Sequence, residues 1–259
     1  PVPAKTVEKI RDLCGPEAKF WTPYGATECL PVAVIEGEQL HLTRAGTEQG
    51  FGTCVGWALP ENTVRLIKIN DDAIIDWNDN LQVEQGEIGE LTVAGPSATD
   101  SYFHREHANQ MGKITETLSN GTQRIVHRMG DLAWQDSQAR LWFCGRKSQR
   151  LQTLQGLLGT ENVEPIFNIH PSVLRSALVG IGPSHQQTPV LCVELEANNK
   201  LSEAQLKTEL LAIARTHRHT QHIDIFLVHP KFPVDIRHNA KIGREQLSVW
   251  AAECLSKKQ

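Results

Sequence analysis

The sequence predicts an α+β protein, and three observations support this fold class. Candidate strands dominate the first part of the chain, after one opening helix at Ala4–Leu13 that ends at Cys14-Gly-Pro16. Candidate helices and strands alternate more regularly in the second part. The 259 residues, 40% of them hydrophobic and 22% charged, are enough to bury a core in one large domain or two modest ones.

Short apolar runs bounded by turn residues mark the strands of the first part. A first strand is expected at residues 19–22. The others are expected at residues 31–35, 63–69, 90–94, 124–126 and 141–144. Turn signals such as Asn70-Asp-Asp72 and Asn120-Gly121 separate some of these runs. The first part is therefore predicted to be mainly sheet.

The second part reads as a compact α+β module. Ser202 and Gln205 have the spacing of a capping box, which predicts the start of a helix there. The remaining elements are expected, in order, as a helix at residues 163–169, strands at 174–179, 190–195 and 223–228, and a last helix with Leu247, Trp250, Ala251 and Cys254 on one stripe.

A polar segment separates the two parts. Gly145-Arg-Lys-Ser-Gln-Arg follows the apolar run Leu141-Trp-Phe-Cys, and the part before it carries the acidic excess and five of the six tryptophans. We therefore expect two domains, residues 1–147 and residues 148–259. The chain opens on Pro-Val-Pro without an initiator methionine, so it is expected to be either processed or an internal piece of a longer protein, and the motifs favour the second.

Composition excludes several classes of protein. A net charge of −4 gives no electrostatic reason to expect nucleic acid or an anionic membrane as a partner. The longest apolar run, about residues 29–35, is too short to cross a bilayer. Six cysteines without a C-x-x-C pair are typical of reduced thiols. A cytoplasmic protein is the expectation.

The first candidate motif is Tyr24-Gly-Ala-Thr-Glu28, after the expected strand at residues 19–22. An aromatic ring can stack on a nucleobase, a threonine hydroxyl can donate to a phosphate, and a glutamate can hold Mg²⁺. Taken alone, a strand-ending turn with a glycine and a surface carboxylate is the better interpretation.

Two further motifs are His127-Arg-Met-Gly-Asp131, between two candidate strands, and Gly145-Arg146, at the expected domain junction. An aspartate after a glycine turn can accept both hydroxyls of a ribose, and a guanidinium can contact nucleotide oxygens. In isolation, an ordinary β-turn aspartate and a solvated linker arginine explain them better.

The last motif is the loop Phe232-Pro-Val-Asp-Ile-Arg-His-Asn-Ala-Lys241, which leads into the final helix. Lys241 could neutralise charge on a transferring phosphoryl or acyl-phosphate group. The alternative is a solvated lysine near a helix start, which is an unfavourable place for a cation and so slightly favours the functional interpretation.

The order of the motifs carries more information than any one of them. The series Tyr24-Gly-Ala-Thr-Glu28, Gly86-Glu-Ile-Gly-Glu-Leu91, Met129-Gly-Asp131, Gly145-Arg146 and Lys241 resembles the adenylate-forming (acyl-CoA synthetase and luciferase-like) superfamily. The resemblance covers essentially the whole chain, as the C-terminal portion of such an enzyme. Four segments are similar to the olefin-biosynthesis β-lactone synthetases, often labelled fatty-acyl-CoA ligases or peptide synthetases: His127-Arg-Met-Gly-Asp131, Leu141-Trp-Phe-Cys-Gly-Arg146, Ile166-Phe-Asn-Ile-His-Pro171 and Asp235-Ile-Arg-His-Asn-Ala-Lys241.

The resemblance implies a domain assignment and a role for each site residue. Residues 1–147 would be the strand-rich C-terminal part of the large AMP-binding domain, and residues 148–259 a small mobile lid domain. The implied site residues are Tyr24 at the adenine, Gly25 as a further nucleotide-binding residue, Thr27 at the α-phosphate, Glu28 on Mg²⁺, Asp131 at the ribose with Arg146 nearby, Ser148 at the hinge, and Lys241 with Thr27 as catalytic groups.

Departures from the superfamily pattern bear on the product. Met129 stands where a threonine is usual, and Ala240 stands where a glycine usually precedes the catalytic lysine. Around Gly156, Leu154 and Leu158 replace the Lys and Arg that help thioester-forming relatives to line a pantetheine tunnel. The Ser/Thr/Gly-rich phosphate loop is not in this sequence, so the chain alone is expected to lack adenylation activity.

The resemblance implies an ATP- and Mg²⁺-dependent enzyme that adenylates a carboxylate and then closes a 2-alkyl-3-hydroxy acid to a β-lactone with release of AMP. The implied partners are a long-chain 3-hydroxy acid or fatty acid and other olefin-pathway enzymes. One alternative is a long-chain fatty-acyl-CoA ligase, which shares the first half-reaction. A second is a non-catalytic fragment or interaction module.

Overall fold

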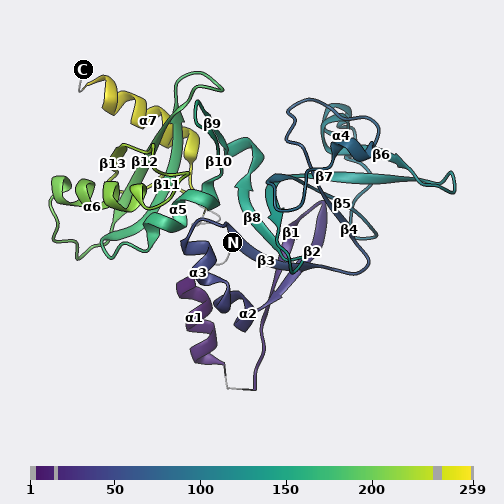
Figure 1. Ribbon diagram of the computed structural model, residues 1–259, viewed down its shortest axis with the longest axis horizontal. Coiled ribbons are helices and arrows are strands. Elements are labelled where there is room, and N and C mark those ends of the chain that lie inside the picture. The colour runs from purple at the N-terminus through teal and green to yellow at the C-terminus, as the bar shows by residue number, and fades with distance from the viewer. Residues whose placement is uncertain (1–3, 15–16, 236–240, 258–259) are drawn as a thin grey trace. The chain divides into compact units, whose positions relative to one another are not determined.

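The computed structural model describes residues 4–14, 17–235 and 241–257. Two compact units divide the chain (Figure 1). One takes the residues up to Gly46 together with Gly52–Lys147, and the other takes Thr47–Phe51 and Ser148–Gln259. The α+β class predicted from the sequence is confirmed. No helix of the described residues combines the length and apolar character needed to cross a membrane.

The first unit is built on one mainly antiparallel sheet. Its strands run in the order β1-β2-β3-β8-β7-β5-β4, with β6 paired to β7. The strands are β1 (Trp21–Ala26), β2 (Cys29–Glu36), β3 (Thr53–Ala58), β4 (Thr63–Ile67), β5 (Gly89–Ala94), β6 (Lys113–Thr117), β7 (Gln123–Gln135) and β8 (Leu141–Arg146). The helices are α1 (Ala4–Leu13), α2 (Gly37–Leu42), α3 (Arg44–Glu48), which runs into the segment assigned to the second unit, α4 (Glu106–Gly112), and the 3₁₀ turn η1 (Asp79–Leu81).

The second unit packs helices on both faces of a small sheet. Strands β11 (Val173–Ile181), β12 (Thr188–Leu195) and β13 (Ile225–Val228) are adjacent in that order, with β11–β12 antiparallel and β12–β13 parallel. The other elements are the 3₁₀ turn η2 (Lys147–Gln149), the hairpin β9 (Leu151–Thr153) and β10 (Gly156–Leu158), and helices α5 (Thr160–Asn168), α6 (Glu203–Arg215) and α7 (Arg244–Ser256).

Alternation along the strands decides which helix covers which face. Leu178 and Leu191 belong to the core shared with α5 and α6. Their neighbours Val179 and Val190 belong to the core shared with α7. Successive strand residues point to opposite faces, so an apolar residue at every position makes a sheet buried on both sides.

The sequence located most of the long elements. The helix at Ala4–Leu13 is confirmed, and Ser202 and Gln205 form the predicted capping box. The first strand is two to four residues later than predicted, so that Tyr24 lies within β1 and not after it. Strands β3, β6, β9 and β10 and helices α2, α3 and α4 were not predicted.

The predicted turn at Met129-Gly-Asp131 is wrong. These residues lie inside the 13-residue strand β7, where a bulge interrupts pairing with β5. Glu90 pairs with Leu132 and Thr92 with Arg128, so two steps on β5 oppose four on β7. Gly130 bends the chain at φ 65°, a left-handed conformation that glycine adopts without steric cost. Bulges of this kind re-aim side chains beside functional sites.

Candidate nucleotide site

Three of the predicted site residues meet around the bulge of β7. The Tyr24 hydroxyl, from β1, donates to Asp131 Oδ2 at 2.6 Å across 107 residues of sequence. Arg146, which ends β8, is the register partner of Asp131, and its Nη1 lies 2.9 Å from Asp131 Oδ1. Because β1 and β7 are not adjacent in the strand order, the sheet must curve to bring these side chains together.

Burial sets the electrostatics of this group. Asp131 is 2% exposed, and burial raises the pKa of its carboxyl against the opposing effects of Arg146 and Tyr24. Burial and the nearby carboxylate also raise the pKa of Tyr24 well above its usual value, which keeps the phenol a hydrogen-bond donor. The ion pair with Arg146 is not aligned as a hydrogen bond, so Asp131 Oδ1 keeps unused acceptor capacity.

The adjacent turn carries Thr27 and Glu28. Ala26 pairs with Cys29, which leaves Thr27 and Glu28 as a two-residue turn between β1 and β2. A side chain at position 25 would place its Cβ 2.4 Å from the Cys29 carbonyl oxygen, so the predicted residue Gly25 is needed for the close approach of the two strands. Thr27 is exposed and Glu28 half-buried.

The carboxylate of Glu28 is held ionised. Burial opposes its charge, but a backbone hydrogen bond, the Tyr102 hydroxyl, and the nearby His127 and Lys113 together leave the pKa of Glu28 below its usual value. No cluster of three or more His, Cys, Asp or Glu side chains that could hold a metal exists among the described residues. A lone carboxylate fits Mg²⁺, which keeps several waters and commonly takes its other ligands from substrate phosphates.

Lys241 and Ser148 lie in the second unit. Lys241 is exposed, next to an antiparallel bridge between Val234 and Ile242, and its carbonyl accepts from the Asp235 amide at 3.0 Å. Ser148 is exposed on the 3₁₀ turn η2. The motif segment at residues 236–240, which includes Ala240, lies outside the described residues.

Sequence reasoning missed a buried ion network beside the site. Glu90 and Arg128, each with a side chain 1% exposed, pair at 2.6 Å, and Lys147 Nζ reaches the same Glu90 oxygen at 3.0 Å. Arg128 also donates to the carbonyls of Asn70 and Asp72 at 2.6 and 2.8 Å. The sequence signal for this network was Arg128, which comes shortly after a run of strand residues. A charged residue that is buried in a strand needs an oppositely charged partner, so its position indicates an ion pair.

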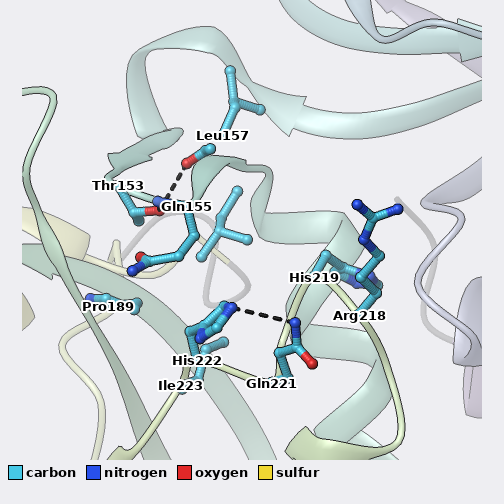
Figure 2. A pocket seen from close by; sticks show the side chains of 11 residues that line it. Thr153, Gln155, Leu157, Pro189, Arg218, His219, Gln221, His222 and Ile223 are labelled. Carbon is cyan, nitrogen blue, oxygen red and sulfur yellow. Dashed lines mark hydrogen bonds between the residues drawn. The ribbon is translucent and has the colours of Figure 1, made fainter.

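The second unit contains a separate cavity of about 640 Å³. Figure 2 shows its lining, which comes from the β9–β10 hairpin, from Pro189 of β12 and from the segment after α6, with Gln221 and His222 hydrogen-bonded at 3.2 Å. Of the residues predicted for the site, none lines this cavity.

The chain is similar to proteins of known family. The AMP-binding enzyme family matches residues 1–103. The chain is 56% identical to an olefin β-lactone synthetase of Xanthomonas campestris over 98% of its own length and 46% of that protein. Identity to the olefin β-lactone synthetase of Stenotrophomonas maltophilia is 55% over 100% and 47%. The chain thus spans about half the length of these relatives.

Among solved structures, the amide bond synthetase McbA of Marinactinospora thermotolerans has a TM-score of 0.70 at 20% identity, covering 95% of this chain and 44% of that one. The O-succinylbenzoate coenzyme A synthetase of Bacillus subtilis in complex with AMP has a TM-score of 0.67 at 22% identity, with the same coverage. At these identities the likeness establishes the fold.

Proposed function

Because the chain belongs to the adenylate-forming superfamily, we propose that it is the C-terminal part of an enzyme that adenylates a carboxylate with ATP and closes the product to a β-lactone. Residues 1–147 form the end of the large AMP-binding domain. Residues 148–259 form a small mobile domain that turns about Ser148 and delivers Lys241. The enzyme acts in the cytoplasm, together with other olefin-pathway enzymes.

One observation carries the nucleotide assignment: Asp131 is buried, anchored by Tyr24 and Arg146, and retains an oxygen with free acceptor capacity. A fixed carboxylate with free lone pairs suits the vicinal hydroxyls of a ribose, since each hydroxyl can donate to it. The ring of Tyr24 offers a face for adenine, and Arg146, half exposed, has further N–H donors for nucleotide oxygens beside its contact with Asp131.

The remaining residues act on the phosphates. Thr27 at the tip of the exposed turn donates to the α-phosphate, and Glu28 beside it binds Mg²⁺, which offsets phosphate charge when bound. Lys241 stabilises the charge that develops at the α-phosphorus while the substrate carboxylate attacks and pyrophosphate leaves.

The second half-reaction is assigned from the relatives. The 3-hydroxyl of a long-chain 2-alkyl-3-hydroxy acid attacks the acyl carbon of the adenylate, the bond from that carbon to the AMP phosphate oxygen breaks, and the hydroxyl proton is released. Keeping both reacting groups on one substrate makes the step unimolecular, which is worth a large effective concentration. Identity of 55–56% to olefin β-lactone synthetases over nearly the whole chain supports this product.

The alternative product, an acyl-CoA, shares the adenylation step. The β9–β10 hairpin argues against it, because Leu154 at the hairpin turn is 76% exposed where thioester-forming relatives commonly carry a basic residue. An uncharged side chain there offers nothing to the phosphates of CoA.

The test uses the intact enzyme with ATP, Mg²⁺ and either a 2-alkyl-3-hydroxy acid or the matched acid without the hydroxyl, each with and without CoA. We expect AMP and a β-lactone from the hydroxy acid without CoA, and only slow hydrolysis of the adenylate from the other acid. Formation of an acyl-CoA from both acids, with no lactone, would support the ligase. Absence of ATP–pyrophosphate exchange with either acid would contradict both enzyme assignments and support the non-catalytic module.

A further inference from the structure

Tyr102 is one of the two tyrosines of the chain. Its backbone amide and its backbone carbonyl both form hydrogen bonds with the side chain of Asn109. The Tyr102 amide donates to Asn109 Oδ1 at 2.6 Å, and Asn109 Nδ2 donates back to the Tyr102 carbonyl at 3.1 Å. These two hydrogen bonds from helix α4 fix the backbone of Tyr102, and so the point from which its side chain extends.

The clamped side chain points at Glu28. Its hydroxyl donates to Glu28 Oε1 at 3.1 Å across 74 residues of sequence, and it is the only side-chain donor to that carboxylate among the described residues. Burial and the neighbouring carboxylate raise the pKa of Tyr102 to about 12, so the phenol keeps its proton at neutral pH.

The neighbouring cation does not replace this bond. Lys113, 8% exposed, is committed to the carbonyl and hydroxyl of Thr99, and its ammonium stands 5.3 Å from the centre of the Tyr102 ring. It therefore favours the charge of Glu28 without binding either carboxylate oxygen. Oε2 of Glu28 therefore receives no side-chain hydrogen bond from the described residues.

We propose that Tyr102 is a positioning residue that occupies Glu28 Oε1, so that Oε2 is presented in one direction to a divalent cation on the nucleotide phosphates. The inference rests on the proposed function, because it takes Glu28 as the metal-binding carboxylate. A half-buried carboxylate on a two-residue turn would otherwise sample several rotamers, and fixing it lowers the entropy cost of binding the metal.

The experiment separates the two tyrosines. Tyr102→Phe and Tyr24→Phe each remove one hydroxyl from the intact enzyme and leave the ring. Two readouts are needed: Mn²⁺ affinity of the ATP complex, from electron paramagnetic resonance of free Mn²⁺, and AMP affinity without metal, from calorimetry. Thermal unfolding of each variant checks the fold.

For Tyr102→Phe we expect Mn²⁺ affinity to fall about tenfold, as is usual when a partner of a metal ligand is removed, with AMP affinity unchanged. For Tyr24→Phe we expect the reverse pattern, since that hydroxyl holds Asp131. The double variant Tyr102→Phe, Glu28→Gln should bind Mn²⁺ no more weakly than Glu28→Gln alone, because a positioning residue acts through its partner.

Two results would overturn the proposal. One affects only the role of Tyr102, and the other also removes the metal assignment of Glu28. If Glu28→Gln weakens Mn²⁺ binding but Tyr102→Phe does not, Tyr102 has no positioning role and the metal assignment of Glu28 stands. If Glu28→Gln itself leaves Mn²⁺ affinity unchanged, the metal assignment in the proposed function fails together with the inference.

Discussion

The two units of this chain treat their candidate functional side chains in opposite ways. In the first, Asp131 is 2% exposed and held by Tyr24 and Arg146, and Glu28 is held by Tyr102. In the second, Lys241 is exposed and its side chain makes no hydrogen bond or ion pair with the described residues. A binding site gains from groups fixed in advance, whereas a charge that must act only in the transition state is most useful when no resident anion neutralises it.

The largest expected effect concerns Lys241, the exposed candidate residue of the second unit. Lys241→Ala in the intact enzyme should lower ATP–pyrophosphate exchange about 10²–10³-fold, the usual effect of losing one charge-stabilising group. ATP affinity should change little, because the ammonium is needed only during reaction. Lys200→Ala, an exposed lysine of the same unit, is the matched control. Exchange near the parent rate in Lys241→Ala would remove this lysine from the mechanism.

The next effect concerns Asp131 and Tyr24, which are held in place by their hydrogen bond in the first unit. Asp131→Ala should raise the KM for ATP about 10–100-fold, with a smaller change in kcat, because the lost contact serves ground and transition states alike. Tyr24→Ala should act in the same direction. Steady-state kinetics of exchange give both constants. Parent-like KM values in both variants would contradict the nucleoside assignment.

The charge of Glu116, a carboxylate of the first unit outside the candidate site, contributes to the stability of the fold. The pKa of Glu116 is lowered to about 2 by hydrogen bonds and ion pairs from Arg65 and Arg124, against the effect of burial. A folded-state pKa depressed below the ordinary value gives stability that is complete above about pH 4.5 and is lost as pH falls toward 2.

Glu116→Gln should therefore lower the free energy of unfolding by about 2–3 kcal/mol at pH 7. The difference from the parent should shrink progressively below pH 4.5. Urea unfolding of both proteins at several pH values between 7 and 3 measures this difference. A pH-independent difference would mean that lost packing, and not the ion pairs, explains it.

The smallest effect tests whether the second unit stands alone. A fragment starting at Ser148 should unfold cooperatively, because its sheet is covered by its own helices on both faces. It loses the hydrogen bond from Asn162 Nδ2 to the Gly50 carbonyl at 2.9 Å, so adding the 47–51 segment should stabilise it by about 1 kcal/mol. Non-cooperative urea unfolding of the fragment would count against an independent unit.

Structural features that depend on a few consecutive residues could be predicted from the sequence. Features that depend on contacts between residues far apart in the sequence were missed. The Ser202 and Gln205 capping box needs only four consecutive positions, and it is present as predicted. Strand β7 was cut short at Val126 because His127 and Arg128 look like loop residues. They are tolerated in a buried strand because Glu90 and the Gly112 carbonyl, far away in sequence, pair with them.

The candidate site shows the same limit. The motif order brought forward Tyr24, Asp131 and Arg146, and the fold brings them together. That the Tyr24 hydroxyl would bind Asp131, or that Tyr102 would bind Glu28, could not be predicted, because both contacts depend on the curvature of the sheet and on the clamp from Asn109. Periodicity indicates which face of a strand is buried, but it does not give the partner across the site.

The buried pair Glu90–Arg128, joined by Lys147, has an evolutionary consequence. Loss of Glu90 would leave the buried Arg128 guanidinium without its carboxylate, at a cost of about 3–5 kcal/mol, so single substitutions of Glu90 should be eliminated and surviving changes should come in combination with Arg128. Asp131 lies three residues from Arg128 on the same strand. The carboxylate of Asp131 is thus carried by a strand segment that should change slowly in evolution, whereas an exposed residue to which no role is assigned, such as Leu174, is free to vary.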